Sequence, residues 1–209
     1  MTVIEKLASS IGRRDEEPNI ELAIKVVDHN DENAVKELIE NLSNKSKSIQ
    51  NDCIKVLYEI GERKPSLLTE YIDQLFLLLD SKNNRLQWGA MTAINSITNV
   101  APEKIFSKIE KIIEVGDKGS VITKDQVVNI LIKLCSSKVY EKQAFKLLIE
   151  QLVKSPTNQL PMYAERSMPI INGENKKLFV EILTSRLDDI EKETKRKRVE
   201  KVILKAGKT

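Results

Sequence analysis

Apolar residues recur along this chain at an interval of 37 residues. Four rows stay apolar through four successive copies: Leu38, Leu75, Ile112 and Ile149; Cys53, Ala90, Val127 and Ala164; Leu57, Ile94, Leu131 and Met168; Ile60, Ile97, Leu134 and Ile171. A period between about 20 and 50 residues is typical of stacked repeat architectures. The pattern therefore predicts a protein in which each copy buries its apolar face against the next one.

Each copy contains two amphipathic segments with a polar turn between them. In the first copy, the apolar positions 35, 38, 39 and 42 form one face of a helix that Asp31 is placed to cap. A second helical pattern runs from Ile49 to Ile60, and Gly61 near its end is a possible C-cap. Pro65 and Pro102 lie one period apart, in the segments that join successive copies. The pattern predicts an all-α chain of helix pairs.

The repeats account for most of a single predicted domain, residues 1–209. Residues 1–30 are expected to form N-terminal capping helices, residues 31–177 four repeats, and residues 178–209 a C-terminal helix pair with a basic end. In the fourth repeat, Pro161 and Pro169 bracket the second helix, which should be short and irregular because proline interrupts helices.

Small residues where the paired helices cross (Cys53, Ala90 and Ala164), polar turns and the period resemble the HEAT and armadillo repeat families. The segment 75–97 carries the resemblance best, while the row Gln50, Gln87, Lys124 and Pro161 departs from the basic residue that HEAT repeats often have there. The resemblance covers roughly residues 31–187. It implies a right-handed α–α superhelix of four to five helix pairs, with the second helices lining a concave face. It implies no particular function.

Rows of polar residues on the second helices are interrupted by larger side chains. The interrupting residues are Trp88, Met162 and Tyr163. We expect the rows to face outward and to bind a partner through Trp88, Thr92, Asn129, Met162, Tyr163 and Arg166. Trp, Tyr and Arg are enriched at the energetic centres of interfaces. The main hypothesis is therefore a non-enzymatic scaffold that binds a protein or peptide on the concave face. The alternative for Trp88 is packing against the turn of a neighbouring repeat.

Charge adds a second hypothesis. The net charge is +3, yet residues 192–209 alone hold eight Lys or Arg against two Glu. A basic helix can neutralise nucleic-acid phosphates, and the candidate contacts are Lys195, Arg196, Lys197, Arg198 and Lys201. The alternative is the solvated face of a terminal helix that buries Val199 and Val202. The body of the chain is mildly acidic, which argues against wrapping duplex DNA along its whole length.

Residue usage restricts the chemistry. His29 is the single histidine, so we expect neither a multi-histidine metal site nor Ser-His or Cys-His catalysis. A HEAT-like DNA glycosylase is a third alternative, although it would need a basic face with several aromatics. We expect no cofactor and read Cys53 and Cys135 as reduced core thiols. No apolar run is long enough to span a membrane, so a cytoplasmic location is expected, while the oligomeric state stays open.

Overall fold

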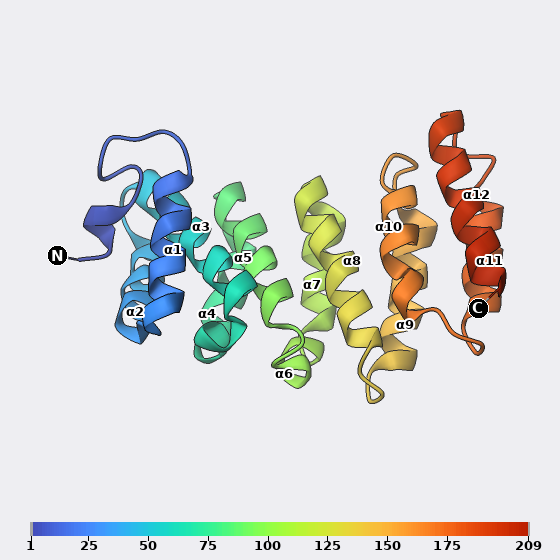
Figure 1. Ribbon diagram of the computed structural model, residues 1–209, viewed down its shortest axis with the longest axis horizontal. Helices are drawn as coiled ribbons and strands as arrows, with labels where there is room; N and C mark the ends of the chain where they lie inside the picture. Colours follow the sequence, from blue (N-terminus) through green and yellow to red (C-terminus); the bar gives the residue numbers. More distant parts are fainter. Residues whose placement is uncertain (1, 209) are drawn as a thin grey trace. The chain divides into compact units, whose positions relative to one another are not determined.

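In a computed structural model, which describes residues 2–208, the chain is built of helices (Figure 1). These residues form twelve α-helices and five short 3-10 segments and contain no strand, which confirms the all-α prediction. They divide into two compact units: unit 1 ends at Val127 and unit 2 begins at Val128, both inside the helix α8. The single domain predicted from the sequence stays a prediction, and its limits at residues 1 and 209 lie outside the described residues.

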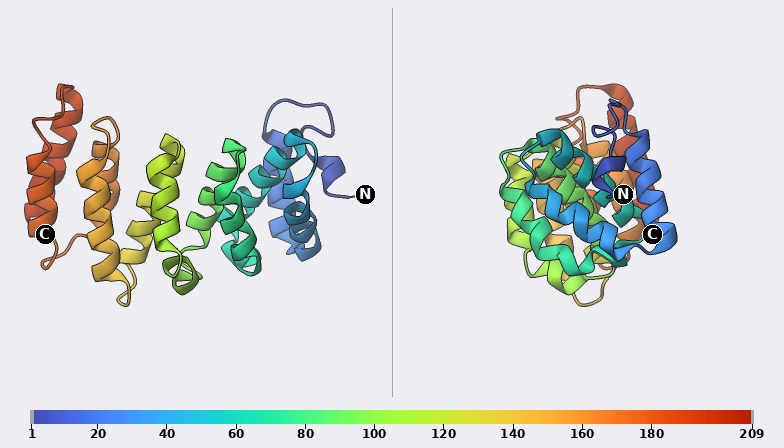
Figure 2. Two further views of the ribbon diagram at one scale, coloured as in Figure 1. Left: turned by 180° about the vertical axis from the view of Figure 1, so that it is seen from behind. Right: turned by 90° about the vertical axis from the view of Figure 1, so that its left-hand side faces the viewer.

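Unit 1 holds the N-terminal segment and the first repeats. Its elements are η1 (Ile4–Lys6), α1 (Glu17–His29), α2 (Glu32–Glu40), η2 (Asn41–Ser43), α3 (Lys47–Arg63), η3 (Pro65–Tyr71), α4 (Ile72–Leu77), η4 (Leu78–Asp80), α5 (Asn84–Ile97), α6 (Pro102–Phe106), α7 (Ile109–Lys118) and the first part of α8 (Val121–Cys135). Helix α1 packs on α3, and α3 packs on α5, so the last helices of successive copies lie side by side (Figure 2).

The repeat has three elements rather than the predicted two. A short helix, η3 or α6, precedes each pair in the second and third copies, and it begins at Pro65 or Pro102. Proline suits this position because its φ angle is already helical and the first turn has no N–H partner to lose. The segments that join these copies, in which the two prolines lie, therefore contain an additional short helix.

The apolar rows form the core. All their members are buried except Met168, which is half-buried. Met168 lies beyond α10, in the 3-10 segment η5 (Met168–Ile170) that contains Pro169. Proline ends the regular helix just before this row would be completed. The expected short, irregular element in the fourth repeat is thus present.

Unit 2 contains the rest of α8 followed by two further helix pairs. Its elements after α8 are α9 (Glu141–Lys154), α10 (Leu160–Ser167), η5, α11 (Lys176–Ser185) and α12 (Glu193–Lys208). Helix α12 packs against both α10 and α11 and buries Val199, Val202 and Ala206. Pro161 lies in the first turn of α10, where the helix tolerates it.

Two local signals had different outcomes. Asp31 caps α2 as predicted, since its carboxylate accepts a hydrogen bond from the Ala34 N–H at 2.9 Å. The C-cap role for Gly61 is wrong, because α3 continues to Arg63. A Cβ at Gly61 would lie 2.2 Å from the Ser96 Oγ atom. Glycine therefore permits the close approach of α3 and α5 at this point.

Within residues 2–208, no helix combines the length and the apolar character needed to cross a lipid bilayer.

Candidate binding surface

Trp88 lies half-buried on α5, beside the last helix of the preceding copy. Its ring stands 5.8 Å from that of Tyr58 on α3, centroid to centroid, with the planes at 44°. A Cβ at the adjacent Gly89 would lie 2.6 Å from the Ile54 Cγ1 atom, so glycine lets the two helices bring these rings together. Trp88 is thus neither a core residue nor a fully exposed one.

Two cations cover the rings. The Arg85 guanidinium carbon lies 5.4 Å from the centroid of the Trp88 ring, and the Lys55 Nζ atom lies 4.7 Å from that of Tyr58. A cation over an aromatic face is attracted by the negative potential of the ring. We call Lys55, Tyr58, Arg85 and Trp88 the aromatic–cationic cluster.

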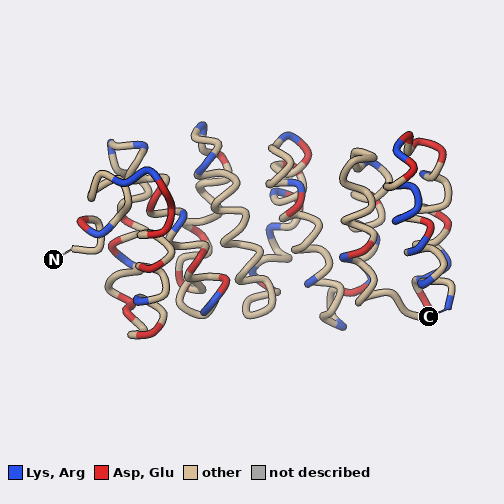
Figure 3. Tube along the Cα trace, turned by 45° about the horizontal axis from the view of Figure 1, so that its top comes forward, with Lys and Arg blue, Asp and Glu red and all other residues tan. Residues whose placement is uncertain are grey.

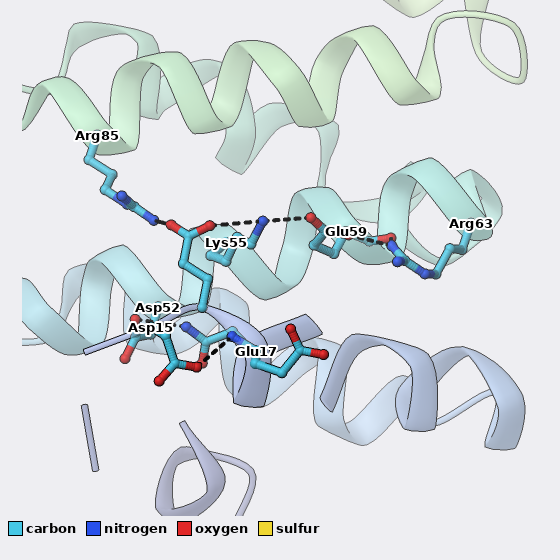
Figure 4. Close-up of polar contacts among 9 residues, drawn as sticks. Asp15, Glu17, Asp52, Lys55, Glu59, Arg63 and Arg85 are labelled. Atoms are coloured by element: carbon cyan, nitrogen blue, oxygen red, sulfur yellow. Dashed lines mark hydrogen bonds and ion pairs between the residues drawn. The ribbon is translucent and has the colours of Figure 1, made fainter. Parts of the chain in front are cut away.

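A chain of ion pairs runs through this cluster (Figure 4). Glu16, which immediately precedes α1, pairs with Arg85 and lies 3.1 Å from the Lys55 Nζ atom. Lys55 also donates to Glu59 at 2.6 Å, and Glu59 in turn pairs with Arg63. Positive and negative groups therefore alternate from α5 to the end of α3, and the five side chains together carry one net positive charge.

The pKa values of these groups follow from two opposing effects. Burial would lower the pKa of Lys55, but the nearby Glu59 and Glu16 carboxylates outweigh it and raise the pKa above its usual value. Burial would raise the pKa of Glu16, but Arg85 and Lys55 hold it below its usual value. The pKa of Glu59 is lowered against its burial in the same way, by Lys55 and Arg63. All three groups are therefore charged at neutral pH.

Two of the residues predicted to face outward do not. Thr92 is buried, and its hydroxyl donates to the Trp88 carbonyl at 2.9 Å within α5. Tyr163 is only 2% exposed. Gly89 occupies the same repeat position as Tyr163 two copies earlier, and a Cβ there would meet Ile54 of α3. Because both side chains are buried, the outward placement of Thr92 and Tyr163 is wrong.

The remaining predicted surface residues belong to unit 2. Arg166 on α10 is exposed, and its Nη1 atom donates to the Asn129 Oδ1 atom on α8 at 3.2 Å. These residues are 37 positions apart, so the structure brings together two members of one predicted row. Asn129 and Met162 are half-buried. The partner-binding role of these residues stays a prediction.

The basic residues of α12 are largely paired within unit 2. Arg198 makes two hydrogen bonds to Glu165, at 2.8 and 2.6 Å. The amine of Lys195 donates to Asn158 at 2.6 Å. Further pairs join Lys197 to Glu193, and Arg196 to Asp188 and Glu200. Lys201 is exposed. Figure 3 shows acidic and basic positions interleaved at this end of the chain.

Other reactive groups show ordinary structural environments. His29 ends α1, and its Nδ1 atom lies 2.8 Å from the Lys25 carbonyl oxygen. Cys53 and Cys135 are buried free thiols, and burial raises the pKa of each to about 12. In the part of the chain that the structure describes, no three or more His, Cys, Asp or Glu side chains gather in a way that could hold a metal ion.

Comparison with known proteins identifies the architecture. A designed armadillo repeat protein in complex with the peptide (KR)4 superposes with a TM-score of 0.67 and 18% identity, over 89% of this chain and 85% of the other. The fold is armadillo-like. The resemblance to helical repeat families noted in the sequence is therefore confirmed for the architecture.

Two further structures superpose on this chain. A computationally designed armadillo repeat protein for modular peptide recognition has a TM-score of 0.65 and 17% identity, over 89% of this chain and 86% of the other. An engineered protein from a structural genomics consortium has a TM-score of 0.61 and 18% identity, over 99% and 98%. No sequence-family model and no curated protein sequence matches the chain. At these identities the likeness concerns the fold alone.

The sequence did not indicate the ion-pair chain, and two of its members, Arg85 and Glu16, differ in how they could have been found. Arg85 could have been noticed, since it precedes Trp88 by three positions and so lies on the same side of a helix. Glu16 has no such signal, because it is 69 positions from Arg85.

Proposed function

We propose that this chain is a non-enzymatic scaffold. It binds a protein or peptide along the surface formed by the last helix of each repeat. The observation that carries the proposal is the position of Trp88, a half-buried ring held in a polar surface by Tyr58 and Arg85. A large aromatic side chain that is already ordered loses little conformational freedom on binding, so more of its contact energy appears as affinity.

The armadillo-like fold supports a peptide as the partner. One of the structurally similar designs is in complex with a peptide, and another was made for modular peptide recognition. In unit 2, the exposed Arg166 and its partner Asn129 offer hydrogen-bonding groups from neighbouring repeats, which is a second candidate contact. We place the protein in the cytoplasm, an assignment in keeping with its two free, buried thiols.

The nucleic-acid alternative receives less support. Lys195, Arg196, Lys197 and Arg198 already contact groups of the same chain, and most of those groups are carboxylates. Binding phosphates would require these contacts to break or to be shared. The glycosylase alternative would need a basic face with several aromatics, and we do not propose it.

Peptide selection tests the proposal directly. A random peptide library is selected on the wild-type protein, and the recovered peptides are titrated against wild type and Trp88→Ala. We expect Trp88→Ala to weaken binding by about tenfold or more, as at other aromatic anchors. The matched control is Leu77→Ala, which removes a side chain that is 74% exposed on α4. Equal loss in both variants, or no loss in either, would reject Trp88 as the anchor.

Stability measurements separate a binding effect from a folding effect. The contact between the Trp88 and Tyr58 rings contributes about 0.5–1.5 kcal/mol beyond simple burial. We therefore expect Trp88→Ala to lower the free energy of unfolding modestly and to leave the circular dichroism spectrum unchanged. A variant that fails to fold would show that Trp88 acts mainly in packing, and Arg166→Ala would then test the unit 2 face.

A further inference from the structure

The carboxylate of Glu16 occupies a site that other elements build. Arg85 comes from α5, and Lys55 comes from α3, whereas Glu16 belongs to the segment before α1. The Lys55 side chain is only 8% exposed and that of Arg85 is 32% exposed, while Glu16 is 43% exposed. The side chains of Lys55 and Arg85 are thus more buried than that of Glu16. The Glu16 carboxylate contacts them from the solvent side.

Both donors, Lys55 and Arg85, have supporting contacts other than Glu16. Lys55 is fixed by its hydrogen bond to Glu59 and by the ring of Tyr58 beneath it. Glu59 is itself held by Arg63, and Arg85 rests on the ring of Trp88. A site whose donors are ordered beforehand loses less freedom when a ligand binds.

The Glu16 side chain is held by two ion pairs and is itself 43% exposed. Ion pairs of partly exposed side chains contribute little to stability. Helix α1 does not depend on the side chain either, since Glu16 makes no capping hydrogen bond. The Glu17 N–H donates instead to Asp15 at 3.2 Å. The Glu16 side chain can therefore rotate away while the start of α1 remains in place.

One donor atom is left over. Glu16 accepts from the Nη2 atom of Arg85, whereas the buried Nε atom has no hydrogen-bond partner among residues 2–208. A buried donor without a partner costs free energy. A carboxylate that is not tethered to α1 can engage both nitrogens, which is the bidentate arrangement that favours arginine at carboxylate sites.

The positive charges beside the two rings determine which charge a bound side chain of the partner must carry. Arg85 already covers the Trp88 ring and Lys55 covers Tyr58, so a lysine or arginine of a ligand finds these positions taken and is repelled. When Glu16 swings out, Lys55, Arg63 and Arg85 outnumber the single remaining carboxylate, Glu59. These four side chains then carry two net positive charges.

Resting on the proposed peptide-binding function, we infer that the aromatic–cationic cluster is a docking site for an acidic peptide. A glutamate or aspartate side chain of the partner takes the place of Glu16 between Lys55 and Arg85. Glu16 is then an internal competitor that weakens binding of the partner.

The test uses the single tryptophan as the reporter. The octapeptides (ED)4 and (KR)4 are titrated against the full chain while Trp88 emission is recorded. We expect (ED)4 to shift the emission and to bind at least about tenfold more tightly than (KR)4, because the site is positive once Glu16 leaves. Equal or tighter binding of (KR)4, or no response to (ED)4 up to about 1 mM, overturns the inference.

Two matched pairs of variants identify the site. Glu16→Gln should tighten (ED)4 binding by up to about fivefold, which corresponds to the free energy of one partly exposed ion pair. The control is the neighbouring Glu17→Gln, and the effect of Glu16→Gln should exceed any change in that variant. Arg85→Gln should weaken it by about tenfold or more, while Arg14→Gln, which removes the same charge from an exposed position, has a much smaller effect. Equal effects within either pair overturn the inference. If Arg85→Gln does not fold, the comparison of Glu16→Gln with Glu17→Gln alone decides whether the inference holds.

The outcome is separable from that of the proposed function. Library peptides that require Trp88 but are basic or neutral, and that bind Glu16→Gln no differently, would leave the scaffold proposal standing and reject the acidic site. Peptides whose binding ignores Trp88 altogether would reject the scaffold anchor, and the acidic site would be rejected with it.

Discussion

The aromatic–cationic cluster in unit 1 and the basic helix α12 in unit 2 both gather positive side chains, but in different environments. Lys55 is 8% exposed and rests on an aromatic ring, whereas Arg198 is 47% exposed and pairs with an exposed Glu165. Screening by water makes exposed pairs weak, while partly buried charges depend strongly on their partners. The number of cations in a region is therefore a poor guide to a site, and their burial is a better one.

The two regions also differ in how completely their charges are matched. On α12, most basic residues have an acidic or amide partner from the same unit. In the ion-pair chain that runs through the cluster, one net positive charge and the buried Nε atom of Arg85 remain after Glu16 and Glu59 are paired. A surface with donors left over can gain on binding, whereas a matched one must first lose contacts.

The largest expected effect is on stability. Lys55→Met removes the cation between Glu16 and Glu59 and leaves Glu59 partly buried with Arg63 alone, so we expect a loss of about 2–4 kcal/mol in the free energy of unfolding. Arg198→Met on α12 should cost less than about 1 kcal/mol. Urea unfolding of both variants measures the difference. Equal losses would show that burial does not distinguish the two regions.

A glycine substitution should change stability in opposite directions in the two regions. Gly89→Ala places a Cβ 2.6 Å from Ile54, so we expect a loss of about 1–3 kcal/mol from overpacking and a shifted Trp88 emission. Nothing lies within 4 Å of a Cβ at Gly207 in α12, where alanine should be neutral or stabilise the helix by up to about 1 kcal/mol. Thermal unfolding compares them. A neutral Gly89→Ala would mean that α3 and α5 can separate without cost.

The smallest effect is the response to acid. The folded-state pKa values of Glu16 and Glu59 lie below the ordinary value of 4.5, so their stabilising contribution is present above that pH and is lost as the pH falls below it. Glu59→Gln should therefore flatten the loss of stability between about pH 5 and 3 relative to wild type. Glu165→Gln should flatten it less, because its pair with Arg198 is exposed. A steeper acid response in Glu59→Gln would contradict the assigned direction.

Prediction from the sequence succeeded where the spacing of residues on one face of a helix was enough to place them. The rows that begin with Leu38, Cys53 and Ile60 are buried in every copy. Their constant spacing places these apolar side chains on the same helix face in each copy, and that face packs into the core. Asn129 and Arg166 meet for the same reason, as members of one row. Thr92 and Tyr163 were misplaced because neighbouring helices cover a helix in a stack from both sides. Its solvent-exposed face is therefore narrower than that of a helix in an isolated pair.

The sequence by itself determined the helical repeat, its core rows and the Asp31 cap, since these follow from spacing within a few turns of the chain. Only the tertiary structure decided the short helices at Pro65 and Pro102 and the close approaches at Gly61 and Gly89. It alone brought Glu16 to Arg85 across 69 positions. Such contacts depend on how elements distant in sequence pack, and no local pattern of residues encodes that geometry.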